Sequence, residues 1–221
     1  MHISIPKCYN TDIKKTTKEK NIMKKFVNFL SAFRIITAFA IIPTIMFGLY
    51  WTTFILYILG AISDWLDGYL VRKYDCCSKL GGVMDHIGDK LLVCNTFVML
   101  TILMPVWFIV IPVIIMIARE LYISGLREFL GTQKIEMPVP KARFSMGKIK
   151  TTIQMIATTA FLLLMAVGSS VTPNTTSSFV FYMIYTLPQI GIFCLWFALV
   201  ASLWSATQYT ITFAQKLKKA K

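Results

Sequence analysis

The sequence predicts an all-α protein that crosses a membrane six times. Hydrophobic residues make up 56% of its 221 residues, against roughly 45–50% in soluble domains. Several apolar stretches reach the roughly 20 residues that a helix needs to cross a bilayer. The 23 lysines and arginines fall in blocks, with none in residues 35–71, 91–118 or 151–215. Basic blocks between long apolar stretches are typical of membrane helices and their loops.

The apolar stretches and the breaks between them define the expected helices. We expect them at about 26–50, 52–73, 79–104, 106–131, 146–168 and 179–215. Pro43 is tolerated in the outer half of the first helix, and the third helix ends before Pro105. The last stretch is longer than one perpendicular span requires. We therefore expect Pro188 to divide a short surface piece from the sixth helix.

Basic residues sort the loops into two groups. The loops near 50–52, 104–106 and 168–178 contain none, whereas the N-terminus, the 73–79 turn, the 132–146 loop and the C-terminus all do. The positive-inside rule therefore predicts both termini in the cytoplasm, as in a multi-pass protein of the inner (cytoplasmic) membrane. The same placement explains the net charge of +13, because basic loops also attract anionic lipids. We expect no nucleic-acid partner.

One membrane domain, residues 24–216, is expected between two polar ends. Residues 1–23 are lysine-rich and predicted to be a disordered extension, and residues 217–221 form a basic tail. Met23 begins the stretch "MKKFVNFLSAFRIITAF" and is a candidate initiator. The five cysteines lack the spacing of a metal site and are interpreted as structural.

Four aspartates lie inside the apolar part of the chain at helical spacing. Asp64 and Asp67 are three residues apart, while Asp85 and Asp89 are four apart on the next expected helix, with Gly81 on the same stripe. A short basic turn joins the two helices, so they pack antiparallel and both pairs can meet near their cytoplasmic ends. Four carboxylates packed together cannot all stay ionised without a cation. Oxygen ligands favour hard divalent ions, and two ions about 3.5–4 Å apart suit phosphoryl transfer.

An alternative is that the aspartates make salt bridges with nearby basic residues, namely Arg72, Lys73, Lys79 and Lys90. Two acid pairs in register on adjacent helices are a costly way to make salt bridges. Glycines on the same stripes also let a ligand approach the helix backbone. We therefore favour a cation site over salt bridges.

The acidic residues and glycines also carry a family resemblance. The spacing Asp64-x2-Asp67-Gly68-x2-Val71-Arg72-x8-Gly81-x3-Asp85-x3-Asp89 resembles the signature of the CDP-alcohol phosphatidyltransferase family. Val71 stands where the family has alanine, and His86 where it often has proline. The resemblance covers about residues 24–165. It implies a six-helix homodimer that transfers a phosphatidyl group from a CDP-linked lipid to an alcohol and releases CMP.

The resemblance also implies roles for individual residues. Asp64, Asp67 and Asp85 are implied to hold two divalent ions, Mg²⁺ or Mn²⁺, with Asp89 both beside the metals and the general base. "NFLSAFR" on the first helix resembles the family's Asn-x2-Thr-x2-Arg element. The residues implied to contact the CDP group are Asn28, Ser31, Gly68, Arg72 and Gly81. Arg34 stands at the arginine of this element, but a long side chain at a helix end can also snorkel to the membrane surface, so we leave it out of this set.

Two further stretches point to the acceptor alcohol. "ARELYISGLREFL" and "SMGKIKTTIQM" resemble the bacterial branch of the family whose acceptor is sn-glycerol 3-phosphate. The implied reaction converts CDP-diacylglycerol and sn-glycerol 3-phosphate into phosphatidylglycerophosphate and CMP, a step of phospholipid biosynthesis. Arginine and lysine are suited to a phosphate. The residues implied to hold the acceptor's phosphate are Arg119, Arg127, Lys148 and Lys150.

Other functions remain open at the level of sequence. The acceptor could be another alcohol, such as inositol phosphate or serine. A divalent-cation transporter also places acids in a membrane, but its acids should be spread through the bilayer depth, whereas these four cluster toward one end. A lipid-binding scaffold without activity is a third alternative, which the presence of all four aspartates disfavours.

Overall fold

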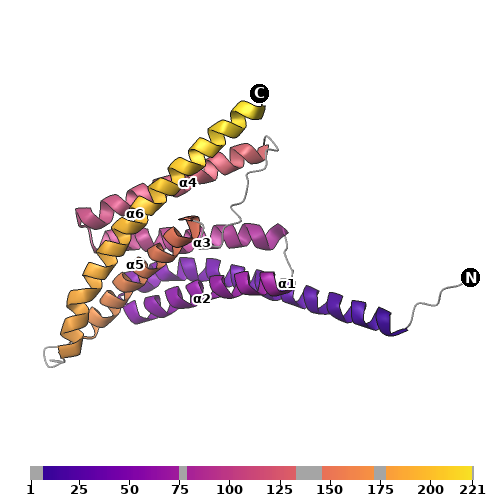
Figure 1. The fold of residues 1–221 in the computed structure, drawn as a ribbon. Helices are drawn as coiled ribbons and strands as arrows, with labels where there is room; N and C mark the ends of the chain where they lie inside the picture. The colour runs from indigo at the N-terminus through magenta and orange to yellow at the C-terminus, as the bar shows by residue number, and fades with distance from the viewer. Residues whose placement is uncertain (1–6, 75–78, 133–145, 172–177, 221) are drawn as a thin grey trace, which may run out of the picture. The chain divides into compact units, whose positions relative to one another are not determined.

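The computed structural model describes residues 7–74, 79–132, 146–171 and 178–220. Within those ranges the side chains of some residues are not described, including those of Arg72, His86, Arg127, Lys148 and Lys150. Every element in the described ranges is a helix (Figure 1). The helices are α1 (Lys7–Met46), α2 (Tyr50–Tyr74), α3 (Lys79–Leu103), α4 (Trp107–Thr132), α5 (Met146–Ser169) and α6 (Ser178–Ala220).

Each helix contains a stretch long and apolar enough to cross a membrane. These stretches are Ile22–Met46, Tyr50–Val71, Gly81–Leu103, Trp107–Leu126, Thr151–Ser169 and Ser178–Gln215. Their length and composition confirm the predicted all-α class and the six membrane helices within the described ranges. The chain is accordingly a multi-pass membrane protein. The placement of both termini in the cytoplasm stays a prediction.

Two helix ends differ from the sequence prediction. α1 begins at Lys7 rather than near residue 26, because residues 7–21 contain no proline or glycine that would end a helix. α6 is a single helix of 43 residues with Pro188 inside it. The predicted break at Pro188 is therefore wrong. A proline removes one backbone N–H, and long membrane helices tolerate it where neighbouring groups satisfy the freed carbonyl.

The chain forms two compact units. The first comprises Met1–Phe47 and Ile55–Asn95, and the second comprises Gly48–Phe54 and Thr96–Lys221. The first unit thus contains α1, most of α2 and the first part of α3. The second contains the end of α3 together with α4, α5 and α6. The proposed division into extension, membrane domain and tail stays a prediction.

Small and polar residues bring the helices of the first unit together. A Cβ atom added to Gly60 on α2 would lie 3.0 Å from Leu92 Cδ2 on α3 and 3.3 Å from Thr37 Oγ1 on α1. The Asn95 side chain on α3 donates a hydrogen bond to the Ala38 carbonyl on α1, at 3.0 Å. The three helices therefore meet closely, and the aspartates lie where they meet.

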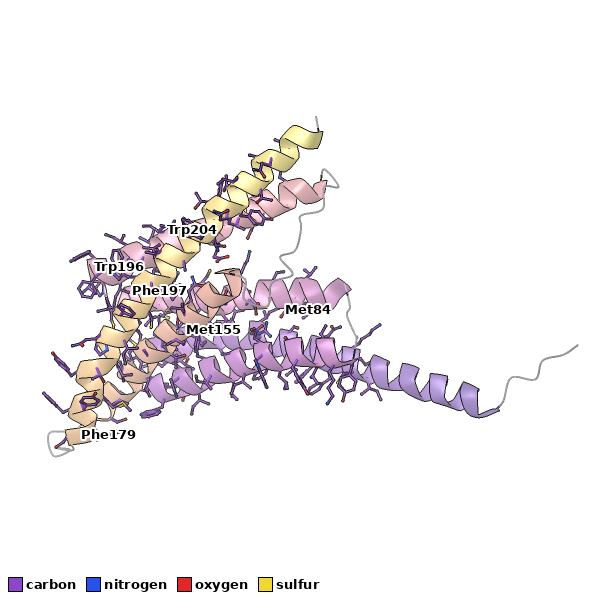
Figure 2. All side chains as sticks on the ribbon, viewed as in Figure 1. Met84, Met155, Phe179, Trp196, Phe197 and Trp204 are labelled. Atoms are coloured by element: carbon purple, nitrogen blue, oxygen red, sulfur yellow. The ribbon has the colours of Figure 1, made fainter. Side chains whose placement is uncertain are left out.

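The second unit is built around α6, which packs along α5 and against α4. The Trp196 indole on α6 donates a hydrogen bond to the Phe108 carbonyl on α4, at 3.0 Å. Figure 2 labels Trp196, Phe197 and Trp204 along α6, and the last two side chains are exposed. A helix that is apolar all round, with large side chains on its outer surface, suits contact with lipid.

Candidate active site

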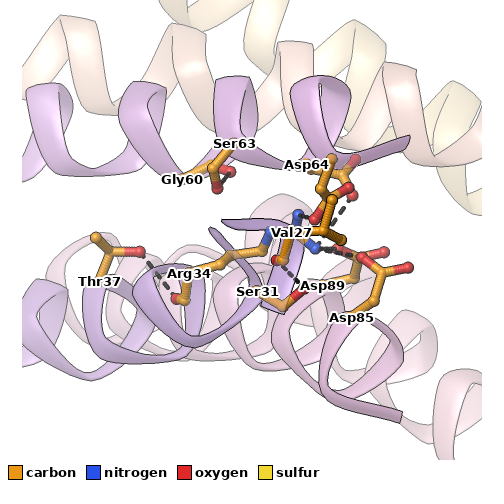
Figure 3. A network of polar contacts seen from close by, with 10 residues as sticks. Val27, Ser31, Arg34, Thr37, Gly60, Ser63, Asp64, Asp85 and Asp89 are labelled. Atoms are coloured by element: carbon orange, nitrogen blue, oxygen red, sulfur yellow. Dashed lines mark hydrogen bonds and ion pairs between the residues drawn. The ribbon is translucent and has the colours of Figure 1, made fainter. Parts of the chain in front are cut away.

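The Arg34 side chain pairs with all four aspartates that the sequence singles out, and Figure 3 labels Asp64, Asp85 and Asp89 beside it. Its Nη1 atom lies 2.8 Å from Asp85 Oδ1 and 3.1 Å from Asp64 Oδ1, and it also contacts Asp89 Oδ1. Its Nη2 atom lies 2.5 Å from Asp67 Oδ2. One guanidinium from α1 thereby connects both acid pairs, on α2 and α3.

The hydrogen bonds of this guanidinium follow from its fixed geometry. Nη1 carries two N–H groups, which donate to Asp85 and Asp89. Nη2 donates to Asp67, while the contact with Asp64 is an ion pair. Among the described residues, the buried Nε atom has no hydrogen-bond partner. The aspartates therefore supply the hydrogen-bond acceptors of the Arg34 guanidinium in the described part of the chain.

Exposure divides the cluster into a closed side and an open side. The Arg34 side chain is 0% exposed and that of Asp67 is 5% exposed, whereas the Asp85 side chain is 44% exposed. Four carboxylates are set against one guanidinium, so acidic groups outnumber basic ones in the cluster. A cluster with this excess of acidic groups, open on one side, attracts cations.

The donor set fits a divalent metal ion. Asp64, Asp67 and Asp85 each offer one carboxylate oxygen, and these oxygens lie within 4.8 Å of one another. Oxygen ligands of Mg²⁺ and Ca²⁺ lie roughly 2.0–2.6 Å from the ion, so one ion can reach all three. This geometry agrees with the predicted use of these aspartates. The assignment of individual ligands stays a prediction, including that of Asp89, which lies outside this set of three.

Local packing explains how α1 reaches the acids. A Cβ atom added to Gly88 would lie 3.4 Å from Arg34 Cδ and 3.6 Å from the Ser31 carbonyl oxygen. Because Gly88 has no side chain, α1 and α3 can approach at the turn between Asp85 and Asp89. Thr37 Oγ1 donates a hydrogen bond to the Arg34 carbonyl oxygen at 2.8 Å. This side-chain hydrogen bond lies within α1, beside the site.

Snorkelling does not explain Arg34. Its side chain is fully buried and turned to the aspartates, because four carboxylates from two neighbouring helices offset its charge in place of water. The basic residues considered above as salt-bridge partners of the aspartates did not include Arg34. A signal was present in the sequence, since Arg34 lies on the expected first helix well inside an apolar stretch. Only the contacts identify its partners.

The residues predicted to bind the CDP group lie near this cluster along α1, α2 and α3. Ser31 is buried, and its hydroxyl donates to the Val27 carbonyl at 3.2 Å. Gly81 is also buried, while Asn28 and Gly68 are half-buried. The Arg72 side chain lies outside the described residues. Their contacts with a nucleotide stay predictions.

The predicted acceptor residues lie in the second unit. Arg119 on α4 is buried, and its Nη1 donates to Glu120 Oε1 at 2.5 Å. The buried Gln154 on α5 donates to Met116 Sδ on α4, at 3.1 Å. Met116 is one turn before Arg119, and Gln154 is one turn after Lys150. This contact therefore brings the turn that carries Arg119 close to the start of α5.

The structure does not describe the side chains of the other predicted acceptor residues, which are Arg127, Lys148 and Lys150. Gln154 was not among the residues that the sequence singled out. The sequence did contain a sign of its importance, because Gln154 is a lone amide in an apolar helix. Only its contact with Met116 places Gln154 near Arg119.

Comparisons with known proteins identify the family of this chain. The sequence model of the CDP-alcohol phosphatidyltransferase family matches residues 25–204. A protein of Shigella flexneri serotype 5b is 32% identical over 183 residues, which cover 81% of this chain and 90% of the relative. A protein of Rickettsia felis is 35% identical over 149 residues, or 64% of this chain and 77% of the relative.

A plant relative is similar over a shorter region. The protein of Arabidopsis thaliana is 39% identical over 115 residues, which cover 48% of this chain and 49% of the relative. All three relatives are named CDP-diacylglycerol–glycerol-3-phosphate 3-phosphatidyltransferase. The family match spans most of the chain and includes Arg34 and all four aspartates. This chain therefore belongs to the CDP-alcohol phosphatidyltransferase family.

Proposed function

We propose that this chain transfers the phosphatidyl group of CDP-diacylglycerol to sn-glycerol 3-phosphate, giving phosphatidylglycerophosphate and CMP in phospholipid biosynthesis. The observation that carries the proposal is the family match over residues 25–204, together with relatives of this named activity that align over up to 90% of their length. The acid cluster lies inside the matched region. The chain is accordingly a CDP-diacylglycerol–glycerol-3-phosphate 3-phosphatidyltransferase, that is, a phosphatidylglycerophosphate synthase.

Asp64, Asp67 and Asp85 hold the divalent ions in this proposal, and their oxygens within 4.8 Å of one another support it. A Mg²⁺ or Mn²⁺ ion held by these carboxylates would supply positive charge to offset the negative charge that develops as CMP leaves. Two ions are proposed on the family resemblance, and the excess of carboxylates over the single guanidinium of Arg34 supports a site for cations. Asp89 completes the proposed set beside the metals.

Asp89 is the proposed general base. Its carboxylate takes the proton of the acceptor hydroxyl, whose oxygen forms a bond to the phosphorus of the phosphatidyl group. The bond from that phosphorus to the CMP oxygen breaks, and CMP leaves with the electron pair. The partial exposure of the Asp89 side chain supports this role, because a hydroxyl from outside the protein can reach it.

The remaining predicted residues bind the two ends of the substrates. Asn28, Ser31, Gly68, Arg72 and Gly81 are proposed to contact the CDP group. For the acceptor's phosphate, the buried Arg119 is the residue that the structure supports best, because a guanidinium can bind phosphate through two parallel hydrogen bonds. The other proposed ligands of that phosphate are Arg127, Lys148 and Lys150.

The setting of the reaction is also a proposal. We place the protein in the inner (cytoplasmic) membrane as a homodimer, with the acid cluster facing the cytoplasm. CDP-diacylglycerol has acyl chains that stay in lipid and a cytidine head that lies in water, so a site at the membrane surface suits it. The proposed membrane domain, residues 24–216, contains five of the six membrane stretches whole and all but the first two residues of Ile22–Met46.

A panel of acceptor alcohols tests the proposed function. Purified protein in detergent micelles receives CDP-diacylglycerol, Mg²⁺ and one of sn-glycerol 3-phosphate, inositol phosphate or serine, and CMP release is measured. We expect release with sn-glycerol 3-phosphate, loss of release with EDTA, and a fall of at least about 100-fold in Asp89→Asn, in line with loss of a general base. Asp12→Asn is the matched control, since it lies outside the family match.

The outcomes separate the alternatives. CMP release that persists in EDTA, or full activity in Asp89→Asn, would contradict the proposed chemistry. Faster release with inositol phosphate or serine would keep the family chemistry and overturn the acceptor. Absence of CMP release with every acceptor would favour a scaffold or a cation transporter.

A further inference from the structure

We propose that Arg34 is an internal counter-ion, which holds the four aspartates together in the metal-free protein and competes with divalent ions for their carboxylates. The inference rests on the metal-binding part of the proposed function. It makes Arg34 a positioning residue rather than a contact of the nucleotide or of the lipid surface.

The contacts show why the aspartates need such a counter-ion. Asp64 and Asp67 lie on α2, while Asp85 and Asp89 lie on α3, and like charges at this distance repel. The Arg34 guanidinium pairs with all four. It comes from a third helix, so its contacts hold α1, α2 and α3 together at the site. Without a positive charge here, the repulsion would push the acid pairs apart.

The burial of Arg34 points the same way. A fully buried arginine is stable only when carboxylates or other acceptors replace its water. In the part of the chain that the structure describes, the acceptors of Arg34 are the aspartates themselves, and the Nε atom has no hydrogen-bond partner there. The aspartates therefore hold the Arg34 side chain in its buried position, and the guanidinium in turn holds the aspartates close together.

Competition follows from the overlap between the two sets of ligands. Asp64, Asp67 and Asp85 form the set that can hold a metal ion, and each of them also pairs with Arg34. A divalent cation and a guanidinium that share the same carboxylates repel each other. Metal binding therefore weakens the ion pairs of Arg34 with the aspartates. The positive charge of the metal then offsets the carboxylate charges in place of the guanidinium.

Arg34→Gln separates the two effects. Loss of the positive charge should lower the Tm of the metal-free protein, because the aspartates then repel without compensation. It should also tighten Mn²⁺ binding, because no cation competes for the carboxylates. Arg34→Lys keeps the charge, but one ammonium cannot reproduce the hydrogen bonds from both Nη atoms. We expect it to lower the metal-free Tm with little change in Mn²⁺ affinity.

The test uses the full chain in detergent micelles with two readouts that do not depend on activity. Mn²⁺ affinity is measured from the EPR signal of free Mn²⁺, and the Tm is measured in EDTA and in saturating Mn²⁺. For Arg34→Gln we expect Mn²⁺ affinity at least tenfold tighter than wild type and a larger rise of Tm on adding Mn²⁺. Lys25→Gln removes an exposed cation from the same helix and should match wild type in both.

Several results would overturn the inference. These are wild-type protein that binds no Mn²⁺, Arg34→Gln with unchanged or weaker Mn²⁺ affinity, and Arg34→Gln with the wild-type Tm in EDTA. If Arg34→Gln does not fold, Arg34→Lys decides. A metal-free Tm equal to that of wild type would then refute the counter-ion role. Absence of CMP release with every acceptor, together with tighter Mn²⁺ binding by Arg34→Gln, would refute the proposed function and support this inference.

Discussion

Two buried arginines in apolar helices differ in the partners that the structure gives them. Arg34 faces four aspartates on two other helices, whereas Arg119 pairs with Glu120, the next residue on its own helix. A guanidinium held by the acids of the proposed metal site is best suited to offset the charges of those acids. Arg119 instead lies near the start of α5, where two of the lysines proposed to bind phosphate are located, and it is the better candidate for an anionic ligand.

Replacing Arg119 should therefore weaken binding of the acceptor selectively. A charge-assisted hydrogen bond to phosphate contributes about 1.5–3 kcal/mol, so Arg119→Ala should raise the KM for sn-glycerol 3-phosphate roughly 10- to 100-fold. The KM for CDP-diacylglycerol should change little. Steady-state kinetics with each substrate varied in turn measures both constants.

Glu128→Gln is the control for this substitution, since it changes an exposed charge on the same helix and should leave both constants unchanged. An equal rise of both KM values in Arg119→Ala would indicate a general structural defect and contradict a role in acceptor binding.

At the scale of elements, close helix packing depends on a few glycines. A Cβ atom added to Gly191 on α6 would lie 2.9 Å from Phe161 Cζ on α5, and the Phe161 ring is buried. Membrane helices associate through small residues that let their backbones approach. By contrast, a Cβ atom added to Gly125 on α4 would meet no atom within 4 Å.

These two glycines predict opposite effects of the same substitution. Gly191→Ala should lower the Tm, because overpacking costs roughly 1–3 kcal/mol, which exceeds or offsets the roughly 1 kcal/mol that alanine adds through helix propensity. Gly125→Ala should keep or raise the Tm. Thermal unfolding in the same detergent compares both variants with wild type, and a Tm of Gly191→Ala above that of Gly125→Ala would disprove the packing argument.

At the scale of the whole molecule, the outer surface and the charges describe a membrane protein. Large apolar side chains such as Phe181, Phe193 and Leu121 are among the most exposed, which suits contact with lipid rather than water. Most of the basic residues lie in the loops and ends predicted to be cytoplasmic, while Arg34 and Arg119 lie inside apolar helices. The basic loops and ends predict the direction in which the chain enters the membrane.

A fluorescent reporter tests this orientation. A protein that fluoresces only in the cytoplasm, fused after Lys221, should be bright in bacterial cells. The same reporter fused after a truncation at residue 171, within the loop predicted to face outward, should be dark. A dark C-terminal fusion that remains full-length on a gel would contradict the predicted topology.

How far the sequence predicts this protein differs between its parts. The number of helices, their apolar spans and the pairing of the aspartates on α2 and α3 all follow from local patterns. Helical periodicity places Asp64 beside Asp67 and Asp85 beside Asp89, and a short turn makes their helices antiparallel. Spacing also carries the family, which the match over residues 25–204 confirms.

Two features depend on the tertiary structure and cannot be predicted from helical periodicity, namely the partners of Arg34 and the continuation of α6 through Pro188. The partners of Arg34 lie 30 or more residues away in the chain, so no local pattern distinguishes a snorkelling arginine from a counter-ion. The continuation of α6 through Pro188 likewise depends on the packing of the whole helix, since proline alone favours a break. The sequence by itself determined which charges this protein places in the membrane. The fold decided that one of them, a guanidinium from α1, lies among four of the carboxylates, because only three helices packed together bring those groups within hydrogen-bond distance.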